Sequence, residues 1–267
     1  MRSFDVSRLR TVLSCAGIDS GDLVFVHSAL FSLGRIEGAS IQQIPQVLYE
    51  TLCDVVGPRG TVAVPAFNFD FCSGETFDRQ HTPSEGMGAF SEYLRQHPEA
   101  LRSPHPMQSM AAVGDRAHDL TDRDTPGAFD DDGSFDALIE YGARVLMIGC
   151  DINAVSLIHW AEQRASVPYR FWKEFSGRYR DADRIERRTY RMHARDLRRD
   201  PEVRVYPVGQ ILRRRGELRR FRLGSGAVES CRARDFASAA LRLLHRDPNA
   251  LIAHDRPDDS RRTTHGT

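Results

Sequence analysis

A histidine and a glutamate that could transfer protons lie three residues apart in the segment DINAVSLIHWAE, residues 151–162. If this segment is helical, His159 and Glu162 are i and i+3 neighbours on one face. A carboxylate placed there holds an imidazole in one tautomer and raises its basicity, as a general base requires. The spacing therefore predicts a His–Glu base, although a capped helix with an incidental histidine has the same pattern.

A second candidate segment, HSALFSLG, follows an apolar stretch, LVFV, that is typical of a buried strand. Ligands of open α/β sheets bind beyond the carboxyl ends of strands. Small hydroxyl residues and a glycine let backbone N–H groups approach a phosphate there. The GK[ST] core of a Walker loop is missing, and an ordinary strand-to-helix turn is the alternative. The candidate binding residues are His27, Ser28, Ala29, Leu30, Ser32, Leu33 and Gly34.

The proline-rich segment RSPHPMQS, residues 102–109, combines an arginine with two serine hydroxyls. Arginine and hydroxyl donors suit a pyrophosphate, and prolines keep such a loop rigid at little further entropy cost. A plain turn with a surface arginine explains the same residues. The candidate binding residues are Arg102, Ser103, His105 and Ser109.

Two other chemistries are weaker alternatives. Cys150 stands beside Asp151 and suggests a thiol nucleophile, but it ends an apolar strand, and buried cysteines are commonly inert. A metal-dependent hydrolase would need His27, His105, Asp151, His159 and Glu162 to converge on zinc. The sequence has no HExxH pair and no His-x-His, so we expect no metal.

Apolar strands that alternate with amphipathic helices predict an α/β fold with a mostly parallel or mixed central sheet flanked by helices. Residues 22–27, 41–56 and 61–66 read as strand, helix and strand, which implies a parallel pair with a crossover helix. Further strands are expected at 110–113 and 144–149, and further helices at 7–16, 87–96, 154–164 and 234–244.

The chain changes character after residue 167, where aromatic and charged residues alternate over 169–190. This alternation predicts a C-terminal antiparallel β region, with a second hairpin over 212–231 that turns at Arg215-Gly216. We therefore expect an α/β catalytic core at 1–167, a β-rich region with a closing helix packed on that core at 168–250, and a disordered tail at 251–267.

Composition narrows the function classes. The 267 residues are 40% hydrophobic and 28% charged, as in ordinary globular proteins. No stretch approaches the roughly 20 apolar residues of a membrane span. The start lacks a signal-peptide pattern, and five scattered cysteines suit a reducing cytoplasm. Residues 170–222 carry 18 basic and 8 acidic residues, but acids interleave and Lys173 is the only lysine. We expect no nucleic-acid partner and leave a homodimer open.

Four segments, in this order, resemble the aminoglycoside 3-N-acetyltransferase family: VHSALFSLG, VGPRGTVAVPAF, RSPHPMQSMAAVG and SFDALIEYGARVLMIGCDINAVSLIHWAEQ. The segments FCSGETFD, TPSEGMGAFSEYLR and VPYRFWKEFSG are similar to members found with surface-polysaccharide or amino-sugar biosynthesis. The resemblance implies acetyl-CoA as the donor and a primary amine of an aminoglycoside or amino sugar as the acceptor. It places CoA along the HSALFSLG and RSPHP loops, makes His159 the catalytic base and makes Glu162 its partner.

The chain departs from the family pattern six residues before this histidine. Resistance enzymes usually carry aspartate there, whereas this chain has Asn153, with Asp151 as the nearest acid. An asparagine makes no ion pair with a polycationic drug, so we expect a less cationic amino-sugar acceptor. The further candidate catalytic residue is Asp151, and the candidate acceptor-binding residues are Asn153, Asp70 and Glu75. An acidic cleft near His159 would instead favour an aminoglycoside drug as the acceptor.

Overall fold

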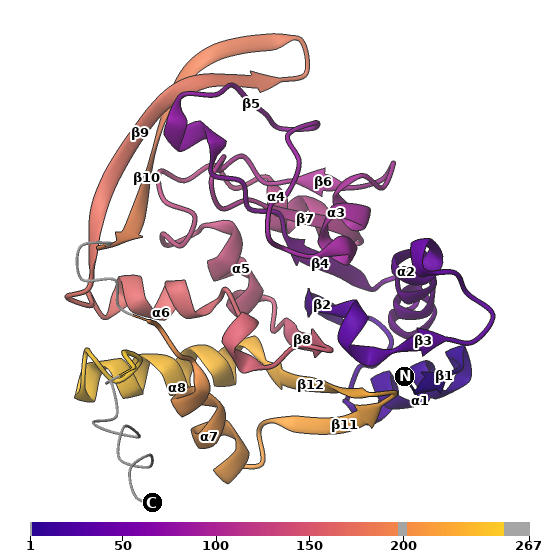
Figure 1. Cartoon of the computed structure of the whole chain (residues 1–267). Coiled ribbons are helices and arrows are strands. Elements are labelled where there is room, and N and C mark those ends of the chain that lie inside the picture. The colour runs from indigo at the N-terminus through magenta and orange to yellow at the C-terminus, as the bar shows by residue number, and fades with distance from the viewer. Residues whose placement is uncertain (1, 197–201, 254–267) are drawn as a thin grey trace, which may run out of the picture.

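The computed structural model describes residues 2–196 and 202–253, and its centre is a mixed seven-stranded sheet (Figure 1). Three central strands, β8, β2 and β4, run parallel, and the strands on both flanks are antiparallel to their neighbours. In spatial order the strands are β11 (Arg219–Leu223), β12 (Gly226–Arg232), β8 (Arg144–Ile148), β2 (Leu23–Ser28), β4 (Thr61–Pro65), β7 (Met110–Gly114) and β6 (Leu101–Arg102). The predicted mixed α/β fold is therefore confirmed.

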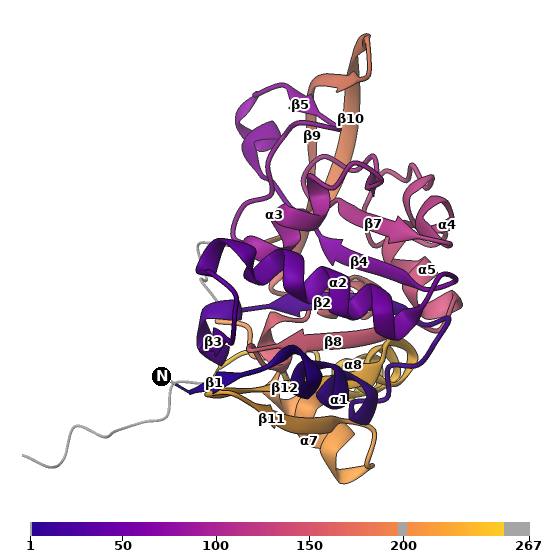
Figure 2. The same ribbon diagram turned by 90° about the vertical axis from the view of Figure 1, so that its right-hand side faces the viewer.

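Alternating side chains of the central strands build two separate cores, because successive residues of a strand point to opposite faces. In β8, Val145 and Met147 enter one core, while Leu146 and Ile148 enter the other. The second core is covered by α1 (Val6–Cys15), α2 (Ile44–Val56) and α3 (Ala89–Arg95). Figure 2 shows α1 and α2 in front of the sheet, with α5 and α8 behind it.

The first core holds the helices that matter for the site. They are α4 (Ala117–Thr121), α5 (Ser134–Glu140), α6 (Ile158–Arg164), α7 (Tyr206–Arg214) and α8 (Ala233–Arg246). Ile158 and Ala161 of α6 are buried in this core together with Phe236 and Ala240 of α8. This packing fixes α6 at the carboxyl end of β8, where the preceding short 3-10 turn η4 (Ile152–Ala154) begins.

A long hairpin stands apart from the main sheet. Its strands β9 (Arg170–Asp181) and β10 (Arg184–Arg195) pair along their whole length, and β5 (Phe77–Asp78) adds to β9. Figure 1 shows the hairpin arching over α5 and α6. Phe71, Phe77, Met107, Tyr179 and Tyr190 form a small third core that anchors it. The C-terminal antiparallel region predicted from the alternating pattern thus exists at 170–195.

The remaining elements are short. Strands β1 (Ser3–Phe4) and β3 (Arg35–Ile36) pair with each other, and 3-10 turns η1 (Leu30–Leu33), η2 (Ile41–Gln43) and η3 (Asp70–Ser73) punctuate the loops. Within the residues that the structure describes, no helix has the length and apolar character to span a membrane.

One predicted element is wrong. Residues 212–231 do not form a hairpin around Gly216; helix α7 ends at Arg214, and the β11–β12 hairpin turns later, between Leu223 and Gly226. Gly216, at φ 71°, follows the helix C-cap, and Gly224, at φ 57°, lies in the hairpin turn. Both positions favour glycine because both need a left-handed backbone, so the pattern alone did not separate them.

The predicted boundary at residue 167 remains a prediction. Strand β12 joins the main sheet beside β8, and α8 lies in the same core as α6, so residues on both sides of that boundary share one sheet and one core. The predicted disordered tail at 251–267 lies, from residue 254 onward, outside the described residues.

Candidate functional site

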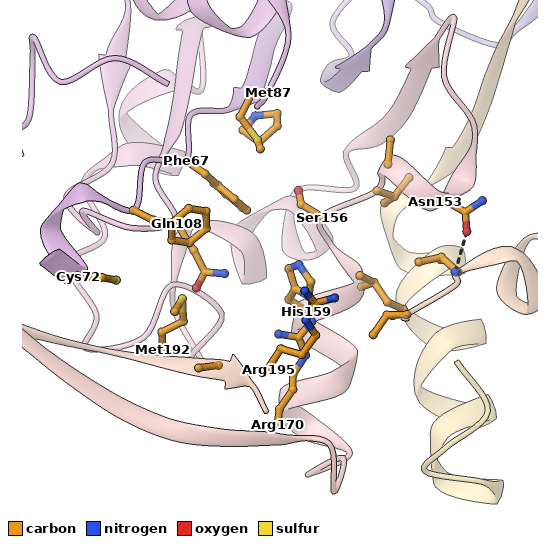
Figure 3. A pocket seen from close by; sticks show the side chains of 18 of the residues that line it. Phe67, Cys72, Met87, Gln108, Asn153, Ser156, His159, Arg170, Met192 and Arg195 are labelled. Carbon is orange, nitrogen blue, oxygen red and sulfur yellow. Dashed lines mark hydrogen bonds between the residues drawn. The ribbon is translucent and has the colours of Figure 1, made fainter. Parts of the chain in front are cut away.

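A cavity of about 1010 Å³ opens where the carboxyl ends of the parallel strands meet the hairpin (Figure 3). Its lining comes from the ends of β2 and β4, the turn η4, helix α6, and the inner face of β9–β10. The wall is mostly apolar, with Phe67, Phe69, Phe171 and Met192 among its side chains. Open sheets with parallel strands commonly bind ligands beyond the carboxyl ends of the strands. The HSALFSLG segment, which follows an apolar strand, predicted a site at this edge of the sheet.

His159 lies in this cavity with its predicted partner behind it. His159 Nδ1 is 2.6 Å from Glu162 Oε2, and the histidine side chain is 28% exposed while the glutamate is fully buried. Helix α6 brings the two together as i and i+3 neighbours. The Phe129 ring meets the imidazole edge to face at 5.6 Å, so the ring is held by packing as well as by its hydrogen bond.

A third residue completes this cluster from the hairpin. Arg170, the first residue of β9, places Nε 2.8 Å from Glu162 Oε2 and Nη2 3.1 Å from His159 Nδ1. Its Nη1 donates to the backbone oxygen of His193 across the hairpin at 3.1 Å. No local sequence pattern predicts that Arg170 meets Glu162, because the contact joins strand β9 to helix α6.

These contacts fix the protonation states. Burial raises the pKa of Glu162, but the hydrogen bond from His159 and the charges of His159 and Arg170 outweigh it and bring that pKa to about 2. An ionised carboxylate only accepts hydrogen bonds, so Nδ1 of His159 carries the proton and Nε2 keeps a lone pair. Burial and the Arg170 charge lower the pKa of His159, against the opposing effect of Glu162. The ring is therefore a neutral base near pH 7.

His27 also lines the cavity, but its contacts position α6. Its Nε2 accepts the backbone N–H of Ser156 at 3.1 Å and lies 3.1 Å from Ser156 Oγ. Burial lowers the pKa of His27 to about 3, so the ring is neutral and Nε2 is its acceptor. His27 thereby ties the end of β2 to the chain that leads into His159.

Asp151 and Asn153 form a small network at the cavity edge. The Asp151 carboxylate caps η4, accepting the backbone N–H of Asn153 at 2.9 Å and its side-chain amide at 3.0 Å. Asn153 Oδ1 accepts the backbone N–H of Val205 at 2.8 Å. Asn153 lines the cavity, whereas the contacts of Asp151 are those of a cap. A catalytic role for Asp151 has no support in these contacts.

The HSALFSLG loop lies beside the cavity, and only His27 of its candidates lines it. Ala29 N–H donates to Ile148 O at 2.9 Å, and Ser32 Oγ donates to the backbone oxygens of Ala29 and Gly149. The loop therefore runs along the carboxyl end of β8. Ser28, Leu30, Leu33 and Gly34 shape this turn, in which η1 forms and Gly34 has φ 100°. Its role in CoA binding stays a prediction.

The RSPHP loop is held together by its own polar side chains. The buried Arg102 guanidinium, 6% exposed, donates to Ser109 Oγ at 2.9 Å, to Ala66 O at 2.7 Å and to Thr82 O. Ser103 Oγ accepts the N–H of Met110 at 2.8 Å. These contacts describe a structural arginine, so replacing Arg102 should first reduce stability, and the predicted phosphate contact has no geometric support.

His105 in the same loop is structural by its contacts. Its Nδ1 accepts the N–H of Gln108 at 3.1 Å, and its Nε2 donates to Arg191 O at 3.2 Å, which attaches the loop to β10. Burial lowers the pKa of His105 to about 4, so the ring is neutral. A buried histidine with both nitrogens engaged has no free group for a ligand.

The remaining predicted residues lie away from the cavity lining. Asp70 and Glu75 are exposed on the η3 loop, where Asp70 interacts with Asn68, and they do not build an acidic wall near His159. Burial raises the pKa of the Cys150 thiol to about 12, so it is not a thiolate near neutral pH. In residues 2–196 and 202–253, no three His, Cys, Asp or Glu side chains gather where they could hold a metal ion.

The structure adds two polar residues to the cavity that sequence reasoning missed. Gln108 is 7% exposed and points its amide into the cavity (Figure 3), and Lys173 lines the hairpin side. Both stand in segments that the sequence had singled out, RSPHPMQS and VPYRFWKEFSG. The alternation of β9 supplies a further signal, because Phe171, Lys173 and Phe175 share the face that lines the cavity.

Comparisons with known proteins point in one direction. A family model described as aminoglycoside 3-N-acetyltransferase matches residues 25–245. Aminoglycoside N(3)-acetyltransferase III of a Salmonella species is 33% identical over 175 residues, which cover 58% of this chain and 59% of that relative, so the alignment spans less than two thirds of the relative's length. Aminoglycoside N(3)-acetyltransferase VII of Streptomyces paromomycinus is 28% identical over 256 residues, covering 86% and 87%.

Solved structures share the fold. The crystal structure of aminoglycoside acetyltransferase AAC(3)-Xa aligns with a TM-score of 0.77 and 26% identity over 94% of both chains. AAC-IIIb, in a binary complex with CoASH, aligns with a TM-score of 0.78 and 22% identity over 91% of this chain and 97% of that one. AAC-VIa bound to sisomicin aligns with a TM-score of 0.77 and 22% identity over 91% and 98%.

Proposed function

The chain belongs to the aminoglycoside 3-N-acetyltransferase family, and from this membership we propose that it transfers an acetyl group from acetyl-CoA to a primary amine of an amino sugar or aminoglycoside. In this proposal His159 is the general base and Glu162 its orienting partner. The observation that carries the proposal is the buried hydrogen bond between His159 Nδ1 and Glu162 Oε2, 2.6 Å long, at the wall of a cavity of about 1010 Å³.

The reaction needs a base because an acceptor amine is mostly protonated near neutral pH. The ammonium first loses its extra proton to solvent, and the neutral nitrogen then attacks the thioester carbonyl while His159 Nε2 takes a second proton from it. The nitrogen–carbon bond forms, the carbon–sulfur bond breaks, and the imidazolium gives its proton to the departing sulfur, so that CoA leaves as the thiol. Proton transfer of this kind contributes typically about 10²–10⁴-fold, and holding the amine against the thioester contributes further.

Glu162 acts on the imidazolium that forms when His159 accepts the proton. The carboxylate already accepts Nδ1–H, so the positive ring gains an adjacent negative charge without rearrangement. Burial of the ring and the charge of Arg170 oppose this effect, lower the pKa of His159 and keep the resting ring neutral. Together these effects leave His159 Nε2 unprotonated near pH 7, and the Glu162 charge stabilises the imidazolium once Nε2 accepts a proton.

The η4 side of the cavity suits the donor. Its wall includes Val155, Val203 and Val205, which fit the alkyl and amide parts of a pantetheine arm. The HSALFSLG loop lies against residues 148–149, just before η4, so the loop predicted to hold CoA is next to this side. The CoASH complex of AAC-IIIb supports the same donor class for the fold.

The test is release of CoA thiol from acetyl-CoA by the full chain, monitored with a thiol reagent across a panel of amines. The panel contains aminoglycosides of the sisomicin and gentamicin type and simple and nucleotide-linked amino sugars. We expect turnover with at least one amine, and mass spectrometry should show one added acetyl group on it. A chain that binds these amines but releases no thiol with any of them would instead be a non-catalytic sugar-binding protein.

A further inference from the structure

The cavity has two unequal ends on either side of His159. One end, next to η4, is lined by Asn153 and the valines named above. The other end lies under the hairpin, and we call it the hairpin chamber; it is lined by Phe67, Cys72, Gln108, Lys173, Phe175 and Met192. Figure 3 shows Phe67, Cys72, Gln108 and Met192 on one side of His159, with Asn153 on the opposite side.

Lys173 brings a positive charge to the exposed edge of the hairpin chamber. It faces the cavity from β9, opposite Met192 in the hairpin register, and its ammonium lies 4.9 Å from the centre of the Phe175 ring. Within the described part of the chain, no carboxylate lies within ion-pair distance of its ammonium. Arg170 pairs with Glu162. Lys173 is also the only lysine of a chain with 37 Lys and Arg residues.

Gln108 brings an unused hydrogen-bonding group to the floor of the same chamber. The residue is 7% exposed, its amide points into the cavity, and the amide has no hydrogen-bond partner among the described residues. The amide faces the cavity, so a ligand that pairs with it is oriented by it. The amide can donate to an oxygen and accept from a hydroxyl or an amine.

Among the residues that the structure describes, no acidic side chain belongs to the lining of the hairpin chamber. The acidic residues in the cavity lining are Asp196 and Glu202; Glu202 pairs with Arg204, and neither is among the six residues of the chamber. An acceptor with several ammonium groups would therefore meet apolar walls and one ammonium. An acceptor with an anionic group would find the opposite charge.

Resting on the proposed acetyl transfer, we propose that the hairpin chamber binds the acceptor, and that this acceptor is an amino sugar bearing a phosphate, whose phosphate contacts Lys173 and whose sugar hydroxyls contact Gln108. The donor approaches from the η4 side, and the amine lies between the two at His159 Nε2. A charge-assisted contact of an ammonium with phosphate has the chemistry that Lys173 offers.

The test measures binding by calorimetry, with the full chain and matched probes: glucosamine and 3-amino-3-deoxyglucose, each with and without a phosphate on C6. We expect each phosphorylated sugar to bind at least about tenfold more tightly than its unphosphorylated counterpart, as for one good charge-assisted hydrogen bond. Lys173→Met should abolish most of that ratio, and Gln108→Glu, which places a negative charge in the same volume, should reverse it.

Arg187→Met is the matched control. Arg187 is exposed on β10 and stands opposite Arg178 in the hairpin register, an odd number of residues from the Met192–Lys173 position, so it lies on the other face of the hairpin from Lys173. The substitution removes one positive charge from the same hairpin, and the affinity ratio should stay as in the wild type. A ratio near one in the wild type, or a ratio that survives in Lys173→Met, overturns the proposal.

A kinetic arm separates the acceptor from the donor, since CoA also carries phosphates. Thiol release with the same sugars should show the phosphorylated sugar as the better substrate, with its advantage lost in Lys173→Met. An increase in the KM of acetyl-CoA in Lys173→Met, with an unchanged ratio between the sugars, assigns Lys173 to the donor and overturns the inference. Turnover of aminoglycosides but not of the phosphorylated sugars also overturns the inference, while the proposed acetyl transfer stands. Tight, phosphate-dependent binding without turnover of any amine supports the inference about the chamber and overturns the proposed acetyl transfer.

Discussion

Two buried glutamates of this chain have nearly the same contacts and different surroundings. Glu162 uses Oε2 to meet His159 and Arg170, and Glu229 uses Oε1 to meet Arg213, at 3.3 Å, and Arg220. Both side chains are fully buried, and each leaves its other carboxylate oxygen without a hydrogen-bond partner among the described residues. A buried carboxylate beside arginine is therefore not, by itself, a sign of a catalytic site.

The two glutamates differ in whether a histidine contacts the carboxylate and in whether the cluster adjoins a cavity. Glu162 has a histidine between itself and a cavity of about 1010 Å³. Glu229 lies on β12, where its arginine partners from α7 and β11 are 36% and 58% exposed and end at the surface. A histidine in contact with the carboxylate and a space for ligands distinguish the Glu162 cluster from the Glu229 cluster.

The largest expected effect is at His159. His159→Ala should fold normally and lose at least about a hundredfold in kcat, the low end for removal of a general base. Thermal unfolding should confirm the fold, and calorimetry should show retained CoA binding. Wild-type turnover in this variant would remove the difference between the two glutamate clusters and leave both structural.

Matched substitutions at the glutamates should separate the clusters next. Glu162→Gln should lower kcat by about tenfold to a hundredfold, less than His159→Ala, because the amide oxygen can still accept Nδ1–H but no longer stabilises the imidazolium. Glu229→Gln should keep kcat and lower the free energy of unfolding by about 1–3 kcal/mol, since a charged partner of two arginines is lost. Equal kinetic losses in both variants would contradict the comparison.

Arg170 should appear in the pH dependence of kcat/KM. The pKa of His159 lies below its usual 6.5, so activity, which needs the neutral ring, should fall only below that pH. Arg170→Met removes a positive charge that lowers this pKa, so the acid limb should move to higher pH. Arg170→Lys keeps the charge and should keep the limb near its wild-type position; movement of the limb to lower pH in Arg170→Met would show that Arg170 does not tune the base.

The smallest expected effect is at the cavity edge. Asn153→Asp removes the amide that donates to Asp151 and places a second carboxylate beside it, so we expect a loss of about 0.5–1.5 kcal/mol in stability. The added charge should raise kcat/KM for aminoglycosides, which carry several ammonium groups, relative to amino sugars with a single amine. An unchanged ratio between these acceptors would show that Asn153 does not contribute to acceptor choice and that its contacts with Asp151 and Val205 are its whole role.

Local patterns in the sequence were enough to predict the contact between His159 and Glu162 and most of the fold. The His159–Glu162 pair depends on a spacing of three in one helix, and helical geometry sets that contact whatever surrounds it. Apolar strands such as residues 144–148 and amphipathic helices such as residues 44–56 also show their character in windows of a few residues. Short-range periodicity carries this information because each element is built from neighbours in the chain.

Candidate ligand-binding residues were harder to predict, because the type of a polar residue does not say whether its side chain binds a ligand or another part of the protein. Arg102, Ser103 and His105 turned out to satisfy the backbone and side chains of their own region, whereas Gln108, in the same segment, points into the cavity. Buried polar groups must find partners, and which partner each finds depends on the atoms that surround it in the folded chain.

The sequence by itself determined an α/β chain with a His–Glu pair on one helix face. Only the tertiary structure decided what meets that pair: Arg170 arrives on a hairpin, His27 reaches α6 from β2 at a separation of 129 residues, and Lys173 faces Gln108's side of the cavity. The physical reason is range. A helix or strand is specified by neighbouring residues, but a cavity, its charge and the pKa of its base come from packing between elements that lie far apart in the chain.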